Sequence, residues 1–132
     1  MAMGLLVAVA GVGLFGVVRD NSARLDALEN AGRAFLKDLA ADKGEDACAH
    51  MTRTARSQLA ADQRKDSCPQ AVAALVGPLN DTERNSLASS YKSRFFARDG
   101  GLGHVGVRDN ALGITALILS DKDGKWLVAD IR

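Results

Sequence analysis

The first 18 residues of the chain contain no charged side chain and no hydrogen-bonding side chain. A helix over Met1–Val18 would be about 27 Å long, close to the ~30 Å hydrocarbon core of a bilayer. A domain formed by the remainder of so short a chain cannot cover the whole circumference of an apolar helix. We therefore predict a single transmembrane anchor over residues 1–18, followed by one domain over residues 19–132.

A cleaved or truncated export signal is the alternative interpretation of this segment. A signal peptide has basic residues before its apolar core and a small-residue cleavage site after it. No Lys or Arg precedes the apolar run here, and Ala8–Ala10 come too early in the run for such a site. An uncleaved single-pass anchor is therefore the better interpretation.

The same segment contains Gly11–Gly16, which matches the pattern G-x-G-x-x-G. A dinucleotide site also requires a strand before the pattern and a second strand that carries an acidic residue after it. A long charged amphipathic stretch follows instead, and glycines are common in membrane helices. We predict no nucleotide site and no other cofactor.

Charge in the remainder of the chain is balanced. The 17 Lys and Arg residues nearly cancel the 16 Asp and Glu residues, which leaves a formal net charge of +1. Proteins that bind nucleic acid concentrate basic residues against phosphates, so this balance argues against such a partner.

Apolar residues at helical spacing predict three helices in the first part of the domain. The first begins at an Asn21–Ser22 N-cap and covers residues 22–41. The second covers residues 46–60 and places Cys48, Met51, Ala55 and Leu59 on one face. The third begins near Pro69 and stops around Gly77–Pro78.

The pattern changes to short strands after about residue 90. Predicted strands cover residues 91–97, 102–107, 111–119 and 126–131, and Asp121–Gly124 is a strong hairpin signal. Helices followed by an antiparallel meander predict an α+β domain, with three helices packed on one face of a curved sheet of about four strands.

Five short segments resemble a known domain family. They are Ala34–Leu39, Asp46–Thr52, Ala55–Leu59, Cys68–Pro69 and the hairpin Leu119–Val128. Over roughly residues 25–131, the chain resembles the membrane-anchored or secreted small proteins of high-GC Gram-positive bacteria (actinobacteria) that carry a nuclear transport factor 2-like, or cystatin-like and SnoaL-like, domain. These segments are structural rather than catalytic, so the resemblance implies a fold and a compartment more than an activity.

The two cysteines are expected to lie near each other, because a short crossover joins their helices. Cys48 and Cys68 can then reach the Cα separation of 4.4–6.8 Å that a disulfide needs. Two free buried thiols, or a metal or redox site, are the alternatives, but the chain has no C-x-x-C motif and His50 and His104 are far apart in sequence. We predict a structural disulfide and no metal site.

The predicted disulfide and the basic residues beside the apolar segment favour opposite sides of the membrane for the domain. Basic residues follow the segment and none precedes it, which weakly favours a cytoplasmic domain. Disulfides persist outside the cytoplasm. We give the disulfide more weight and predict an extracytoplasmic domain on a single-pass cell-membrane protein.

Some members of the resembled family are isomerases or cyclases, which place an acid or base in an apolar cone between the sheet and the helices. The resemblance therefore suggests catalytic candidates in Tyr91, His50, His104 and Asp130. Pocket-lining positions are expected at Tyr91, Phe95, Trp126 and Asp130, with Asp130 alternating with Trp126 and so able to point inward. No triad, zinc motif or carboxylate pair supports catalysis, so no catalytic residue is assigned.

Other members of the family are accessory subunits of membrane assemblies. The prediction is accordingly a non-catalytic, membrane-anchored module that binds a protein partner. The alternative is a small protein that binds an apolar ligand in the cone, or an enzyme of the cyclase or isomerase type.

Overall fold

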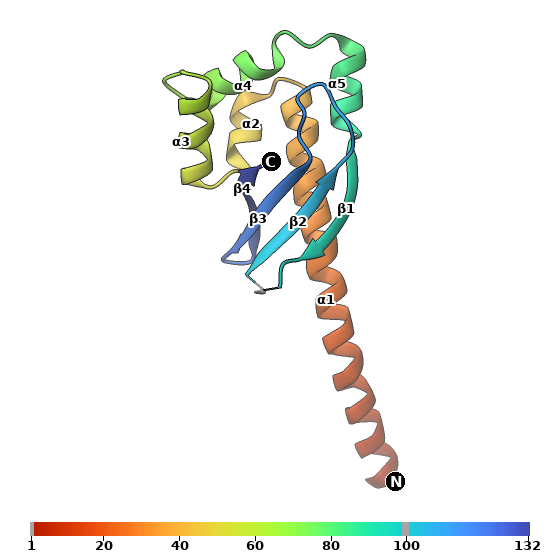
Figure 1. The fold of residues 1–132 in the computed structure, drawn as a ribbon. Coiled ribbons are helices and arrows are strands. Elements are labelled where there is room, and N and C mark those ends of the chain that lie inside the picture. Colours follow the sequence, from red (N-terminus) through yellow and green to blue (C-terminus); the bar gives the residue numbers. More distant parts are fainter. Residues whose placement is uncertain (1, 99–100) are drawn as a thin grey trace.

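The structure is a computed structural model that describes residues 2–98 and 101–132, with side chains described from Asn21 onward. Within these residues, five helices precede four strands, which confirms the predicted α+β class (Figure 1). The domain has helices on one side and a single antiparallel sheet on the other, with one long helix projecting from it.

The projecting helix is α1, Ala2–Ala40, which is 39 residues long. It passes through Asn21 and Ser22 without interruption, so the predicted helix start at these residues is wrong. Its C-terminal half packs against the sheet, and its N-terminal half extends away from the domain (Figure 1). The predicted anchor, residues 1–18, lies outside the residues whose side chains are described.

The predicted helix over 46–60 is two helices, α2 (Gly44–Ala49) and α3 (Arg53–Asp62). The break occurs because Met51 forms a parallel β-bridge with Val128. The Thr52 amide donates to the Val128 carbonyl at 2.9 Å, and the Thr52 hydroxyl then caps α3 by accepting from the Ala55 amide. The pairing partner is distant in sequence, so helical spacing alone does not reveal the break.

Two further helices complete the helical part. Helix α4, Cys68–Val76, begins at a Ser67 N-cap with Pro69 in its first turn and ends at Gly77, as predicted. Helix α5, Asp81–Ala88, begins with a capping box between Asn80 and Glu83.

The sheet is an antiparallel meander in the order β1-β2-β3-β4. Its strands are β1 (Tyr91–Phe96), β2 (Leu102–Val107), β3 (Ala116–Lys122) and β4 (Lys125–Ile131). The predicted hairpin is confirmed: Asp123 and Gly124 both have positive φ, which a two-residue hairpin turn requires. Strand β3 begins five residues later than the predicted 111–119 strand, because residues 110–115 form a separate loop.

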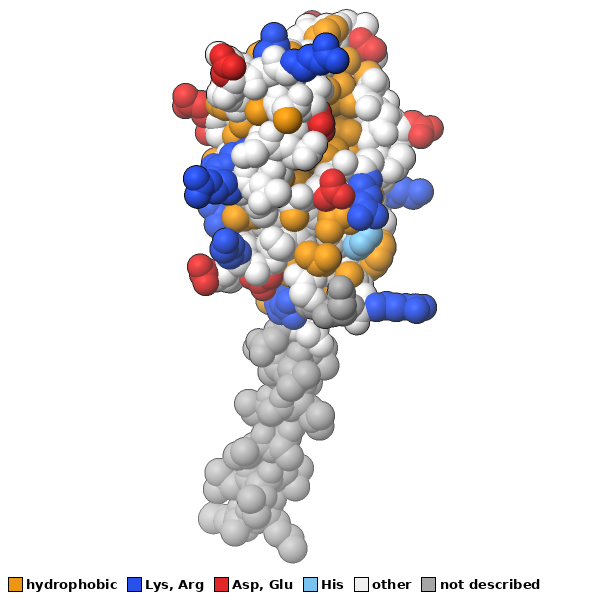
Figure 2. Space-filling model, turned by 60° about the vertical axis from the view of Figure 1, so that its left-hand side comes forward, with side chains coloured by type: hydrophobic (Ala, Val, Ile, Leu, Met, Phe, Trp, Pro, Cys, Tyr) orange, Lys and Arg blue, Asp and Glu red, His pale blue; other side chains and the backbone are white. Residues whose placement is uncertain are grey.

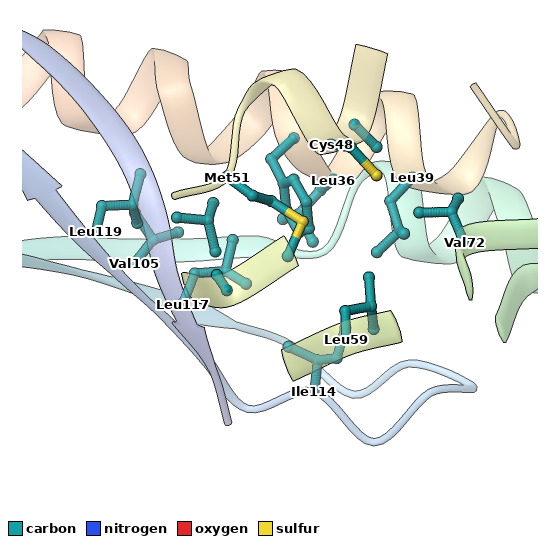
Figure 3. Close-up of a cluster of buried hydrophobic side chains, with 14 of the residues drawn as sticks. Leu36, Leu39, Cys48, Met51, Leu59, Val72, Val105, Ile114, Leu117 and Leu119 are labelled. Carbon is teal, nitrogen blue, oxygen red and sulfur yellow. The ribbon is translucent and has the colours of Figure 1, made fainter. Parts of the chain in front are cut away.

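Alternate residues of the sheet face the helices and fill the space beneath α1. Fully buried side chains from α1 and from the sheet form this part of the cluster: Leu28, Phe35, Leu36, Leu39, Val105, Leu117, Leu119 and Val128. Figure 3 shows several of them between α1 and the strands. Strand β2 contacts α1 closely through Gly103, where an added Cβ would lie 2.6 Å from Leu28 Cδ1.

Candidate functional site

A half-open apolar groove lies between α3, the neighbouring part of α4, the 108–115 connection and the end of β4. Its volume is about 190 Å³. Its apolar lining consists of Met51, Ala55, Leu59, Leu75, Leu112, Ile114, Ala129 and Ile131, and its polar lining consists of Gln58, Asp62, Gln63 and Asp130. Figure 2 shows a strip of hydrophobic side chains between polar ones on the face that α3 and β4 share.

Asn110 builds one wall of this groove. Its side-chain amide donates to the carbonyls of Arg108 and Ile114, at 2.7 and 2.8 Å. Its side-chain oxygen accepts from the amides of Leu112 and Ile114, at 3.1 and 3.2 Å. Gly113, with φ of +70°, allows the chain to turn back within this loop. One polar side chain therefore holds Leu112 and Ile114 in the groove.

The floor of the groove is the hydrophobic core itself. Met51 is 2% exposed and lies beneath the groove, beside Leu117. Leu59 and Ile114 lie together on the side of this cluster away from α1 (Figure 3). An apolar group that enters the groove would therefore extend the core by one more layer.

The opposite wall begins at the edge of β4. The Val128 amide donates to the His50 carbonyl at 2.7 Å, so residues 50–52 cover this part of the strand edge and set the start of α3. Gln58, one turn further along, donates to Asp62 at 2.8 Å, and both side chains are exposed. The groove thus has an apolar floor and a polar, solvent-exposed rim.

The predicted disulfide between Cys48 and Cys68 is confirmed. It joins α2 to the first residue of α4, with a Cα–Cα distance of 6.1 Å and a sequence separation of 20. Both cysteines are buried, and neither is a free thiol in this structure. The bond fixes α2 against α4, the helix that supplies Leu75 to the groove.

Tyr91 lies outside the groove, in a polar cluster that joins β1 to α1. Burial, together with a hydrogen bond to Glu29, raises the pKa of the Tyr91 phenol. The same hydrogen bond, with the charges of Arg33 and Arg94 nearby, lowers the pKa of the Glu29 carboxyl. Arg94 also donates to the Leu25 carbonyl and to Asp26, both at 3.0 Å. These contacts of Tyr91 and Arg94 with Glu29 and Asp26, called the clasp below, hold β1 against α1.

Phe95 and Trp126 lie on opposite faces of the sheet. Phe95 is 52% exposed on the face that no helix covers, where it stacks on His104 at a ring separation of 4.6 Å. Trp126 is buried on the inner face near Phe96, and the Arg24 guanidinium lies 5.7 Å from its ring centroid. Neither side chain lines the groove.

Asp130 is one of the residues that line the groove, but its carboxylate does not point into the interior between the sheet and the helices. Leu119 pairs with Val128 while Ile118 pairs with Asp130, so Ala129 is a bulged extra residue. The bulge reverses the alternation after Val128, and the Asp130 carboxylate is exposed and bonded to Arg132 at 3.0 Å.

The two histidines do not meet. His50 lies 2.8 Å from the Asp38 carboxylate, at the end of α2, whereas His104 lies in β2 under Phe95. Among residues 21–98 and 101–132, no group of three or more His, Cys, Asp or Glu side chains is arranged to hold a metal ion. The catalytic candidates are thus dispersed over the domain.

Comparison with protein-family models, curated proteins and solved structures found no match. Within the part of the chain whose side chains are described, no helix is long and apolar enough to cross a bilayer.

Of the residues that line the groove, the sequence pattern indicates Met51, Ala55 and Leu59 as one helix face and Asp130 as a pocket-lining position, but it does not indicate the loop around Asn110. Asn110 lies just before the predicted strand 111–119, which wrongly includes Leu112 and Ile114. The one available signal is the Asn110-x-x-Gly113 spacing, since Asn bonds to nearby backbone and Gly tolerates positive φ.

Proposed function

We propose that the chain is a non-catalytic, membrane-anchored extracytoplasmic module that binds a protein partner through the groove. The size and the floor of the groove carry this proposal. Pockets for small molecules commonly measure about 300–1,000 Å³, whereas this groove measures about 190 Å³. It fits one or two apolar side chains of a partner better than a whole cofactor or a polycyclic substrate.

The interior beneath α1 also supports binding over catalysis. The space that would form an active-site cone is filled by apolar side chains such as Leu117, Leu119 and Val128, each fully buried. The one buried polar side chain among the described residues is Ser90, which donates to the Leu87 carbonyl. An acid or base with a strongly shifted pKa would need such a buried position.

The continuity of α1 supports the anchor. One helix runs from the apolar segment into the core, where Leu28, Phe35 and Leu36 are fully buried. A span of residues 1–18 would then hold the domain without a flexible linker. The groove lies toward the end of the domain away from the N-terminus (Figure 1), so it would remain accessible above a membrane.

The order of helices followed by a four-strand meander is consistent with the nuclear transport factor 2-like family that the sequence resembles. Accessory subunits of membrane assemblies in that family bind partners without catalysis. This family membership is part of the proposal.

Membrane topology can be tested in cells that express the full chain. Because both native cysteines are in the disulfide, Ser86→Cys on exposed α5 introduces one free thiol. We expect the protein to stay in membranes after an alkaline carbonate wash. The new thiol should react with an impermeant maleimide in intact cells. Release by carbonate would contradict the anchor, and labelling only after lysis would contradict the orientation.

Partner binding can be tested with a photo-crosslinking residue in place of Gln58, beside the groove, and with the same residue in place of Ser86 as the matched control. A specific crosslinked product is expected from position 58 alone, and Leu112→Lys should abolish it by placing a charge in the groove. Equal products from both positions would contradict the groove as the binding site.

A further inference from the structure

The β3–β4 hairpin ends in two lysines that face each other. Lys122 and Lys125 are paired in register, and both are exposed. Like charges directly opposite each other destabilise an antiparallel pair. Among the described residues, no acidic side chain lies within ion-pair distance of either lysine. A bound anion would relieve this repulsion.

These lysines lie on the face of the sheet that no helix covers. Their neighbour Asp121 points inward to Arg24 on α1, at 3.7 Å, so the alternation along β3 places Lys122 on the opposite, outer face. The same face carries apolar side chains at the same end of the sheet. Figure 2 shows hydrophobic side chains there, with Lys or Arg side chains near the projecting helix.

Phe95 is the exposed large apolar group of this face, and it lies on β1, two strands away from the lysine of β3. It is 52% exposed, and it pairs in register with His104, which in turn pairs with Ile118. Ile118 is 5% exposed although it is not part of the core cluster, so neighbours on the outer face must cover it. An exposed aromatic and exposed lysines on one face of a sheet are groups that bind at the headgroup level of an anionic bilayer.

The hairpin lies at a level along α1 that is close to the surface of a membrane spanned by residues 1–18. Asp121 is held at the level of Arg24 by their ion pair. Arg24 follows Val18 by six residues, about 9 Å along a helix axis. The hairpin turn extends further toward the N-terminus of α1 (Figure 1). Lys122 and Lys125 therefore lie within the ~10 Å Debye length of a membrane that contains residues 1–18.

Other charges at this end do not cancel the two lysines. Asp121 is neutralised by Arg24, which leaves Asp123 as the opposing charge in the hairpin. The hairpin thus retains an excess of positive charge on one face.

We propose that Phe95, Lys122 and Lys125 form a docking surface for anionic phospholipid headgroups, which tilts the domain onto the membrane that holds its anchor. This proposal rests on the anchor of the proposed function. A tilt of about 20° is ordinary for a membrane-spanning helix, so a rigid α1 can bring this surface down. The docked surface would fix the direction in which the groove opens.

The test uses the full chain in vesicles of phosphatidylcholine, with or without phosphatidylglycerol, each containing a headgroup-nitroxide lipid. A fluorophore on Ser120→Cys reports from the outer face beside the patch, and one on Ser86→Cys is the distant control. We expect several-fold stronger quenching at position 120 when phosphatidylglycerol is present, and no such change at position 86.

Two variants separate the contributions of charge and apolar contact. Lys122→Gln with Lys125→Gln should remove the phosphatidylglycerol dependence, with each lysine accounting for about fivefold in the docked population. Phe95→Ser should weaken the quenching in both kinds of vesicle. Equal quenching with and without phosphatidylglycerol would overturn the proposal, as would quenching that changes with protein concentration alone and so indicates a second copy.

Retention of the chain in the vesicles after a carbonate wash is measured separately in the same samples. If the chain is washed from the vesicles by carbonate, the proposed function fails. If it stays but position 120 does not respond to phosphatidylglycerol, the anchor stands and the docking surface fails.

Discussion

Gly32 on α1 faces Val105 on β2 so closely that an added Cβ would lie 2.9 Å from Val105 Cγ2. The reciprocal contact is made one helical turn earlier, where Leu28 packs over Gly103. Each pair combines a glycine from one element with a branched apolar residue from the other. This arrangement sets the short distance between the long helix and the sheet.

Gly32→Ala is therefore expected to destabilise the domain. Overpacking costs about 1–3 kcal/mol, which exceeds the ~1 kcal/mol that Ala gains over Gly inside a helix. In a Val105→Ala background the clashing methyl groups are gone, so the same change should become stabilising. Denaturant unfolding followed by Trp126, the single and buried tryptophan, measures both effects.

Gly101→Ala is the control for this pair, because nothing lies within 4 Å of a Cβ at that position. It should leave the free energy of unfolding nearly unchanged. The same effect of Gly32→Ala in both backgrounds would show that Val105 does not set the helix–sheet distance.

Asn110→Ala is expected to loosen the loop that forms the groove wall. The change removes four hydrogen bonds and leaves the Ile114 amide and carbonyl without their side-chain partner. We expect a loss of about 1–3 kcal/mol and faster hydrogen exchange at the Leu112 and Ile114 amides. Asn110→Asp keeps the acceptor and should protect these two amides better than Ala does. Equal exchange rates in the two variants would contradict the role of the side-chain oxygen.

The features that could be predicted from the sequence are those set by nearby residues. Helical spacing identified the buried face of α1, and the Asp123–Gly124 turn followed from the need for positive φ. The disulfide was also predictable, because a short crossover limits how far apart two helices can lie. Each of these depends on neighbours within a few turns or one connection.

The features that were missed depend on partners distant in the chain. The break between α2 and α3 follows from the pairing of Met51 with Val128. The outward direction of Asp130 follows from a one-residue bulge opposite β3, which simple alternation does not reveal. The groove depends on the α2–α3 break, on the bulge in β4 and on the loop around Asn110. Its full set of lining residues could therefore not be predicted from the periodicity of the sequence.

Loss of the disulfide is expected to cost about 3 kcal/mol, the chain-entropy value for a closed loop of this length. The variant is Cys48→Ser with Cys68→Ser, and reduction of the unmodified protein should produce the same shift in the unfolding midpoint. Reductant should then have no further effect on the double variant. An unchanged midpoint after reduction would show that the bond does not contribute to stability.

Tyr91 offers a direct test of the clasp between β1 and α1, because it is the only tyrosine. Burial and the bond to Glu29 raise its pKa above the ordinary 10.0. A group whose folded-state pKa is raised stabilises the fold below its unfolded pKa, and this contribution is lost as pH rises through the folded value. Stability should therefore fall above about pH 10, and less steeply in Tyr91→Phe.

Ultraviolet absorbance separates the two causes of the raised Tyr91 pKa. Glu29→Gln removes the carboxylate and should move the phenolate midpoint back toward 10.0, without reaching it, because burial is the larger cause. Glu45→Gln at an exposed position of α2 is the matched control and should leave the midpoint in place.

The effect of Glu29 on stability at acid pH has the opposite dependence on pH. Because the pKa of Glu29 is lowered in the folded state, its carboxylate stabilises the fold above pH 4.5, and this contribution is lost as pH falls. Glu29→Gln should then flatten the acid limb of the stability curve, and identical acid limbs would place Glu29 outside the clasp.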